Sequence, residues 1–548
     1  MTSFARRAIS RHRVRIALLF FACLGLLASR RWQQLVQPQT WNEDGSVVLP
    51  QLMSEGWVTL LEPMNGYLIA SSKIISVFSF SVSLAHYPLV STAITWIFTA
   101  LVGVAIAIAP TILRGRTLCA LAVFLVPTDP EVFGLPLYSF WWAALLLFLV
   151  ALWDERAPAD GWRLGFLMLG GLSSPVVVMV LPILCMRAWR SGQNRREWVV
   201  AAVATVLSTL QLMLIVQGSA GTIPPLQSVL ESTVPIFLGW FLVGNWMPRP
   251  FLLWVAGVLL AALTAVWAFG ERETGRAPVL LYLLGGSVAL AVARFDPSLL
   301  HPSLAGPRHF FLPFVCLYWI LVQIVCSSRL TTPRTAAFVL VMSAIVNAAP
   351  TWTRKHDDLK WERHIRSCRL FPEYWIPVQY DGRGAMAWRT RYDGAACAAA
   401  LERDLLVSRS QLERAPTYAY SVRPSGHDWS GSRVRFLGGT IHGTDYYRSK
   451  PDGERVLGSY DTGDADTGEI ALAMRRGDLL VYRSGPRGEN QRLSIKGYES
   501  AFLSDLPTST DWVVLDFSNS RLPKEFVLTI SDHGSRWGEW FAVRIPVD

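Results

Sequence analysis

The stretch YPLVSTAITWIFTALVGVAIAIAPTI, residues 87–112, contains no Asp, Glu, Lys or Arg over 26 consecutive positions. A helix that crosses a bilayer needs about 20 apolar residues, because each residue adds about 1.5 Å and the hydrocarbon core is about 30 Å thick. This segment is therefore long enough to span a membrane. The whole chain of 548 residues is 51% hydrophobic and 17% charged, with a mean hydropathy of +0.31. These values indicate an integral membrane protein.

Ten further apolar segments predict a polytopic α-helical membrane bundle of about 11 spans. They are residues 14–29, 117–127, 137–153, 163–172, 174–189, 197–217, 250–269, 277–294, 308–328 and 334–349. Several are shorter than a lipid-exposed span, and we expect neighbouring helices to bury them. Residues 66–84 and 231–247 are also apolar. We predict that both lie at the outer face or re-enter the membrane.

Charge predicts the orientation of the chain. Residues 1–350 carry a net charge of +9, whereas residues 351–548 carry +1. With a cytoplasmic N-terminus, 17 basic residues of the first part fall inside and 6 outside, which satisfies the positive-inside rule. A basic excess confined to the membrane part favours a topology signal over nucleic-acid binding. The sequence has no Asn-X-Ser/Thr sequon, so we predict a bacterial inner membrane with the C-terminal region in the periplasm.

Three regions follow from these patterns. Residues 1–350 form the membrane domain with a first outer loop at 30–86, and residues 351–412 form a juxtamembrane α/β connector. Residues 413–548 contain eight short strand-like segments separated by turns, from RVRFLGG at 433–439 to GEWFAVRI at 538–545. Such spacing is typical of an antiparallel β-sandwich or jelly-roll domain.

Two of the seven cysteines lie after residue 350, and the other five lie in or beside the apolar segments. An isolated pair in an oxidising compartment favours a disulfide between Cys368 and Cys397, with two free thiols as the alternative.

Acidic residues gather on the predicted outer face. Glu43 and Asp44 stand in WNEDG at 41–45, shortly after the first span, and Asp129 and Glu131 stand in VPTDPEVFGLP at 126–136. A carboxylate at the membrane surface can act as a general base or as a metal ligand, because partial burial adjusts its pKa. The alternative is an ordinary solvated loop.

Cations also occur at this face, and they are Lys73, Arg294, Arg308 and His309. Arg308 opens an apolar segment, where a guanidinium can bind a phosphate through two hydrogen bonds or can anchor a helix end at the interface. Lys73 lies within an apolar helix and needs a partner, which a phosphate, Glu55 or Glu62 would supply.

This layout resembles the GT-C superfamily of integral membrane glycosyltransferases over residues 1 to about 350. The stretches that carry the resemblance are WNEDG at 41–45, EPMNGYLIASSK at 62–73, PTDPE at 127–131, GGLSSP at 170–175 and GPRHFFLPF at 306–314. The resemblance implies an inverting transfer of a sugar from a polyprenyl-phosphate donor. The acceptor would be a glycan or lipid-linked glycan of the cell envelope, such as O-antigen.

The resemblance also assigns residues. Glu43 and Asp44 would supply the catalytic base, and either could be the principal acid. Arg308, His309, Lys73 and Arg294 would bind the donor phosphate. Asp129, Glu131, Trp41 and Tyr67 would contact the substrate. No cofactor is certain, and a divalent metal stays open.

Two other functions remain open at this point. One is a flippase or another transporter of lipid-linked glycans, and the other is a non-catalytic envelope protein that binds glycan. The predicted spans carry no ionisable residue at mid-depth, which counts against an ion-coupled transporter.

Overall fold

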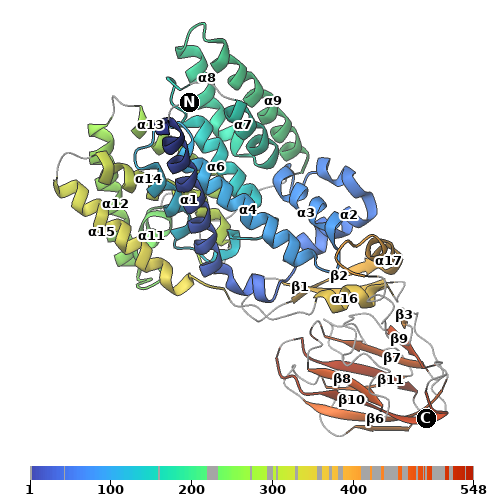
Figure 1. Ribbon diagram of the computed structural model, residues 1–548. Helices are drawn as coiled ribbons and strands as arrows, with labels where there is room; N and C mark the ends of the chain where they lie inside the picture. Colours follow the sequence, from blue (N-terminus) through green and yellow to red (C-terminus); the bar gives the residue numbers. More distant parts are fainter. Residues whose placement is uncertain are drawn as a thin grey trace. The chain divides into compact units, whose positions relative to one another are not determined.

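The computed structural model divides into two compact units, each described here by itself (Figure 1). The first unit comprises residues 1–35, 60–75 and 92–354, and the second comprises residues 36–59, 76–91 and 355–548. The structure describes residues 3–41, 43–157, 161–218, 233–271, 275–292, 300–303, 306–327, 331–354, 361–369, 373–379, 387–408, 420–422, 433–436, 454–459, 467–476, 479–485, 487, 490–495, 513–517, 522–536 and 538–546.

Each of the eleven predicted apolar segments overlaps a helix. These are α1 (Ser3–Val36), α4 (Tyr87–Ile108), α5 (Arg116–Ala122) with η3 (Val123–Leu125), α6 (Ser139–Ala151), α7 (Gly161–Ser173), α8 (Val176–Arg190), α9 (Arg195–Gly218), α12 (Pro250–Gly270), α13 (Arg276–Val292), η8 (Pro307–Phe310) with α14 (Phe311–Ser327), and α15 (Thr331–Ala348). Among the described residues, five helices are long and apolar enough to cross a membrane: α4, α9, α12, η8 with α14, and α15 with η9 (Ala349–Thr351). The chain is thus a mostly helical membrane protein, and the number of about 11 spans stays a prediction.

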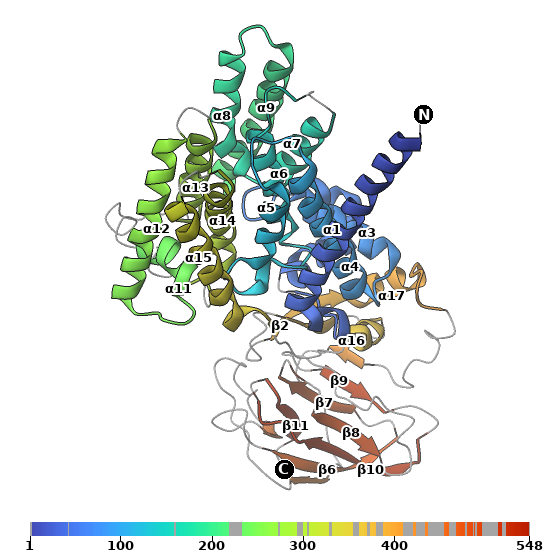
Figure 2. The same cartoon turned by 60° about the vertical axis from the view of Figure 1, so that its left-hand side comes forward.

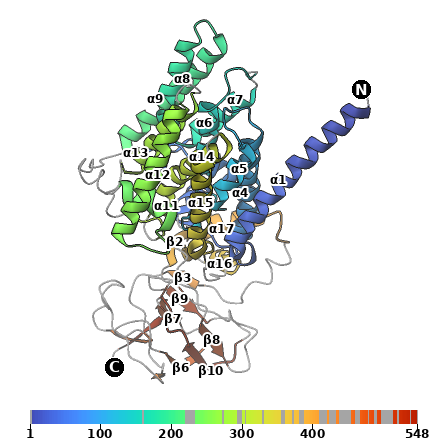
Figure 3. The ribbon, with the colours of Figure 1, turned by 90° about the vertical axis from the view of Figure 1, so that its left-hand side faces the viewer.

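The centre of the helical bundle is formed by α6 and α14. Every residue of α6 except Trp141 is buried, and α14 is buried from Phe311 to Ile324. By contrast, α12 and α15 lie side by side and leave most of their surface uncovered (Figures 2 and 3). Apolar side chains on such uncovered helices suit contact with lipid tails.

Close helix packing explains the short segments around GGLSSP. A Cβ atom on Gly170 would lie 2.6 Å from Leu147 Cγ of α6, and one on Gly171 would lie 2.6 Å from Leu207 Cδ1 of α9. The two glycines therefore let α7 fit between its neighbours. Gln211 Nε2 donates to the Gly171 carbonyl oxygen at 2.8 Å, which adds a polar link between α7 and α9.

The predicted first outer loop is largely helical. Helix α1 continues to Val36 and breaks its helical dihedral angles only at Arg31, so it includes the first seven residues of the predicted loop, 30–36. The following elements are η1 (Asp44–Val48), α2 (Leu49–Glu55), η2 (Gly56–Leu61) and α3 (Ala70–Val82). The two apolar segments predicted not to cross the membrane form α3 and the pair η5 (Thr233–Gly239) and α11 (Trp240–Val243). Whether they cross stays a prediction.

In the second unit, the connector is an α/β element closed by a disulfide. Helix α16 (Trp361–Cys368) and α17 (Gly394–Glu402) flank an antiparallel pair, β1 (Glu373–Gln379) and β2 (Ala387–Asp393). Cys368 and Cys397 are bonded, with their Cα atoms 6.0 Å apart. Asp404 holds the loop before α4, because its Oδ2 accepts from the Ser83 hydroxyl at 2.8 Å and from the Ala85 amide at 3.0 Å.

All eight predicted strand segments contain strands, and these form two antiparallel sheets. One has the order β4-β6-β10-β8 and the other the order β3-β9-β7-β11-β5. Their bounds are β3 Tyr420–Val422, β4 Arg433–Phe436, β5 Glu454–Gly458, β6 Gly468–Arg475, β7 Leu479–Ser484, β8 Gln491–Ile495, β9 Val513–Asp516, β10 Glu525–Asp532 and β11 Phe541–Pro546. Alternate residues of β10 are buried, as expected for a sheet with one covered face. The sandwich or jelly-roll arrangement stays a prediction.

Candidate functional site

The loop between η3 and α6 brings both of its acidic side chains into ion pairs. Asp129 Oδ1 accepts a hydrogen bond from Arg354 Nη1 at 2.9 Å, and Glu131 Oε1 accepts one from Arg308 Nη1 at 2.8 Å. Both carboxylates are buried. Asp129 precedes the short helix η4 (Pro130–Val132), which contains Glu131, and the Asp129 amide donates to the Pro302 carbonyl oxygen at 3.1 Å. Each ion pair supplies a buried carboxylate with a hydrogen-bonded partner of opposite charge.

A tyrosine fixes the orientation of Arg308. The Tyr138 hydroxyl donates to Glu131 Oε1 at 2.5 Å and accepts from Arg308 Nη1 at 3.2 Å. The side chain of Arg308 is nevertheless 30% exposed. An arginine that is held on one side and open on another can meet a ligand without first being ordered, which reduces the entropy cost of binding.

Arg30 is fully buried at the end of α1. Its guanidinium donates to the carbonyl oxygens of Phe124 at 3.0 Å, Val126 at 2.9 Å and Thr128 at 2.7 Å. Its Cζ also lies 4.1 Å from the ring centroid of Phe133. These contacts stabilise a buried cation, because carbonyl dipoles and an aromatic face both attract it, and the charge of Asp129 adds to their effect.

Arg31, at the break in α1, is also buried. It lies in the electrostatic field of Asp129 and Glu131, which stabilise its charge, and of Arg354, which opposes it. The non-helical dihedral angles at this residue redirect the chain where the apolar segment ends. The sequence therefore delivers two adjacent arginines, Arg30 and Arg31, to the same buried region.

We call this set the arginine cluster: Arg30, Arg31, Arg308 and Arg354 with Asp129 and Glu131. Its formal charges are four positive and two negative, so the six side chains hold an excess of two positive charges. A local excess of positive charge attracts anions. Arginine is also the side chain best suited to bind phosphate, because its planar fork presents two parallel donors. The cluster can therefore accept a phosphate group.

The predicted catalytic acids belong to the second unit. Asp44 is 1% exposed and begins η1, while Glu43 precedes it and is half-buried. The negative charge of Asp44 acts on the Tyr87 hydroxyl. Asp44 is thus an enclosed carboxylate rather than a solvated loop charge.

The connector holds the backbone at this position. The Tyr392 hydroxyl of β2 donates to the Gly45 carbonyl oxygen, and a Cβ atom on Gly45 would lie 2.5 Å from Val378 Cγ1 of β1. Burial raises the pKa of the Tyr392 hydroxyl well above its usual value, so this tyrosine stays a neutral donor. Strands β1 and β2 therefore position the acidic pair, which the sequence did not predict.

The other residues predicted to bind the donor phosphate or the substrate differ in burial and in the groups they contact. Lys73 is buried in α3, and its Nζ donates to the main-chain carbonyl oxygen of Glu62 at 2.8 Å. The ring centroid of His309 lies 5.9 Å from that of Trp141, and Tyr67 lies at the same distance from Phe140. Trp41 is buried. Arg294 lies outside the described residues.

Sequence reasoning missed four members of the site. Arg30 and Arg31 were counted only as outer basic residues, and neither Arg354 nor Tyr138 was singled out. The arginine pair directly after an apolar segment was a usable signal, because a cation at that depth needs a compensating partner. Nothing local marked Arg354, whose partner Asp129 is 225 positions away.

The described residues contain no group of three or more His, Cys, Asp or Glu side chains that could hold a metal ion. In the arginine cluster, each carboxylate accepts a hydrogen bond from an arginine.

No protein-family model matches the chain, and no curated protein matches it. Among solved structures, the chain is similar to the cryo-EM structure of arabinosyltransferase EmbB from Mycobacterium smegmatis, with a TM-score of 0.28 and 12% sequence identity. The match covers 96% of this chain and 64% of that one. At this TM-score, the comparison assigns neither the fold nor the activity.

Proposed function

We propose that this chain is an integral membrane glycosyltransferase. It would take a sugar from a polyprenyl-phosphate donor and transfer it, with inversion, to a cell-envelope glycan on the periplasmic face. The arginine cluster supports this proposal most directly. It combines an excess of two positive charges with a partly exposed, pre-oriented arginine, Arg308, in a protein whose helices are apolar enough to hold a lipid-linked donor.

The donor phosphate would bind to Arg308, with Arg31 and Arg354 contributing positive field from buried positions. In the reaction, the acceptor hydroxyl oxygen bonds to the anomeric carbon while the bond between that carbon and the phosphate oxygen breaks. The electron pair leaves with polyprenyl phosphate, whose negative charge grows. Fixed positive charge at the leaving group stabilises this change, because the side chains need not reorganise during the step.

The acceptor proton would pass to Glu43 or Asp44. Asp44 is the better enclosed of the two, and Glu43 is the more accessible. Proton removal by a positioned carboxylate typically contributes a factor of about 10²–10⁴ to the rate. Asp129 and Glu131, which the sequence placed at the substrate, would act indirectly by orienting Arg354 and Arg308.

The test is glycan analysis of a deletion strain complemented with the wild type or with single variants at matched protein levels. We expect the deletion to remove one sugar from an envelope polymer. Arg308→Gln and at least one of Glu43→Gln and Asp44→Asn should fail to restore it. Arg249→Gln is the matched control, because Arg249 is exposed at the N-terminus of α12 and lies outside the cluster.

Arg308→Lys separates charge from geometry, since lysine keeps the charge but loses the planar fork. Partial restoration by this variant would support phosphate binding. A normal glycan profile in all of the Arg308, Glu43 and Asp44 variants would refute the proposed site. A deletion that leaves every sugar in place but reduces surface display would instead favour the transporter.

A further inference from the structure

A second basic site lies at the opposite, predicted cytoplasmic ends of the helices. A cleft of about 350 Å³ opens between the N-terminal turns of α7 and α9. It is lined by Gly161, Arg163, Leu164, Arg195, Arg196, Val199 and Val200. Three arginines therefore meet an apolar wall in a space large enough for a small polar head group.

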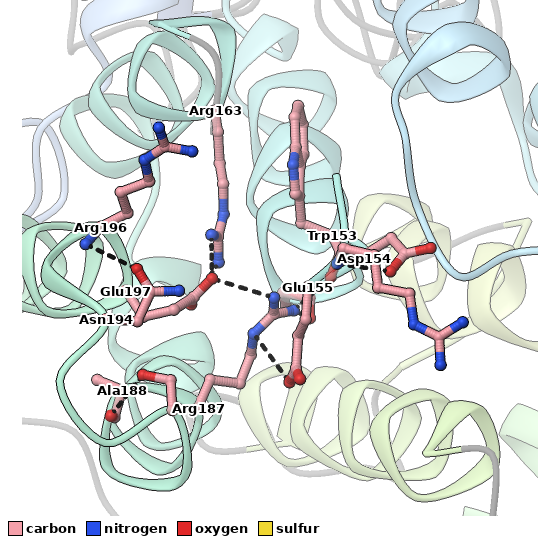
Figure 4. Close-up of polar contacts among 12 residues, drawn as sticks. Trp153, Asp154, Glu155, Arg163, Arg187, Ala188, Asn194, Arg196 and Glu197 are labelled. Carbon is pink, nitrogen blue, oxygen red and sulfur yellow. Dashed lines mark hydrogen bonds and ion pairs between the residues drawn. The ribbon is translucent and has the colours of Figure 1, made fainter. Parts of the chain in front are cut away.

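One wall of the cleft is built by a buried ion-pair network. Arg163 donates twice to Glu197, with Nη1 2.6 Å from Oε1 and Nη2 3.0 Å from Oε2 (Figure 4). Arg187 of α8 approaches the same carboxylate at 3.4 Å and donates to the Trp153 carbonyl oxygen at 2.6 Å. Figure 4 shows both guanidinium groups converging on Glu197. The network fixes α7, α8 and α9 against one another, so the cleft is preformed.

The charge around this cleft is positive. The charges of Arg163 and Arg187 are balanced by those of Glu197 and Glu155, and the exposed side chains of Arg195 and Arg196 leave two net positive charges. Apart from the chain neighbours of Gly161 and the backbone of its own helix, no atom of the described residues lies within 4 Å of the position that a Gly161 Cβ would occupy. A site of this kind attracts an anion and leaves room for it.

Exposed tryptophans lie close in sequence to the residues that line the cleft. Trp162, Trp189 and Trp198 flank the cleft in sequence and are between 51% and 76% exposed. Exposed tryptophans beside apolar helices are typical of the membrane–water interface, where lipid head groups lie. The cleft therefore combines positive charge with a position at head-group level.

We infer that this cleft binds the phosphate head group of an anionic phospholipid of the inner leaflet. Arg195 and Arg196 contact the phosphate, and Val199 and Val200 line the path of the adjoining acyl chain. Basic pockets between membrane helices on the cytoplasmic side suit such lipids, since the leaflet there carries negative charge. The occupant would stabilise the α7–α9 hairpin region without taking part in glycosyl transfer. The inference does not depend on the proposed transferase activity.

The test measures lipid retained by the purified full-length protein. The protein is incorporated into nanodiscs of phosphatidylglycerol and phosphatidylcholine, extracted with mild detergent and analysed by native mass spectrometry. The wild type should retain phosphatidylglycerol in preference to phosphatidylcholine. Arg195→Ala with Arg196→Ala should reduce this preference by roughly fivefold for each arginine. Arg190→Ala is the matched control, because Arg190 is exposed at the end of α8 and does not line the cleft.

Both substituted arginines are exposed, so the double variant should keep the melting temperature of the lipid-free protein. Retention of phosphatidylglycerol by the double variant at the wild-type level would overturn the inference. Equal retention of phosphatidylglycerol and phosphatidylcholine by the wild type, together with inorganic-phosphate binding that the double variant loses, would also overturn it, because the site would then bind the free anion and not a lipid. Neither outcome bears on the arginine cluster, since the measurement records no glycosyl transfer.

Discussion

Asp129 and Arg354 form a buried ion pair, with 2.9 Å between Oδ1 and Nη1, although 225 residues separate them in the sequence. The pair joins the loop before α6 to the segment that follows α15. Both residues belong to the arginine cluster. The ion pair therefore connects two distant segments and also positions one positive and one negative charge of the cluster.

Arg354→Ala should lower the free energy of unfolding by about 3 kcal/mol, because it leaves the Asp129 carboxylate buried without its cation. The measurement is thermal unfolding of the purified protein in detergent. Arg249→Ala, at an exposed position, should have little effect. An unchanged melting temperature in Arg354→Ala would contradict the buried pair.

Glu197→Gln should destabilise the α7–α9 region by a similar amount, since two buried guanidinium groups share this carboxylate. Glu155→Gln is the matched control. Its carboxylate also faces Arg187, at 4.0 Å, but the side chain is 71% exposed and should contribute little. Equal melting temperatures for the two variants would show that burial of the Glu197 network does not matter for stability.

Gly45→Ala should cost about 1–3 kcal/mol by overpacking. The new methyl group would lie 2.5 Å from Val378 Cγ1 and 2.7 Å from Thr40 Cγ2, and both neighbours are β-branched and stiff. Gly25→Ala, where no atom lies within 4 Å, serves as the control. Adding Val378→Ala should restore part of the loss, as measured by protease resistance of the first outer loop. If Gly45→Ala is as resistant to protease as the wild type and Val378→Ala has no effect on it, then Val378 of β1 does not contact Gly45.

Asp532 should make the C-terminal sheets less stable as pH rises. Burial raises its pKa from 3.8 to about 7, and the charge of Glu539 adds to this effect, while the Ser459 hydroxyl and the Gly534 amide oppose it. Below pH 3.8 the carboxyl group is protonated in both the folded and the unfolded states. Between pH 3.8 and 7 only the unfolded state releases the proton, so the free energy of unfolding falls with rising pH and levels off above pH 7.

Asp532→Asn removes this ionisation and should therefore gain stability relative to the wild type between pH 5 and pH 8. The measurement is thermal unfolding of both proteins across this range. Glu525→Gln, at an exposed position in the same strand β10, controls for loss of a negative charge. Parallel pH profiles for wild type and Asp532→Asn would show that Asp532 is ionised in the folded protein throughout.

The position of the helices could be predicted from sequence because it is decided locally. An apolar segment in a membrane must satisfy its backbone hydrogen bonds internally, and a helix does so from neighbouring residues alone. Residues 308–328 illustrate this, because the prediction and the observed η8 with α14 differ by one residue at each end. The strands after residue 413 could also be predicted from local sequence, since each is marked by alternating apolar and polar residues and by turn residues at its ends.

The partners of the charged side chains could not be predicted in this way. For Lys73 the sequence indicated a phosphate or a carboxylate as partner, and it did not indicate the main-chain carbonyl oxygen of Glu62, to which Lys73 Nζ donates. It treated Arg30 as an outer charge, and the fold buries it against three carbonyl oxygens.

The sequence by itself determined that this is a membrane protein, where its helices and strands run, and which acids and cations are candidates for a site. Only the tertiary structure decided that Asp129 meets Arg354, that Glu131 meets Arg308, and that Arg31 joins them. The reason is physical. Hydropathy and backbone hydrogen bonding act over a few neighbouring residues, whereas an ion pair acts over a few ångströms, and packing brings distant parts of the chain to that separation.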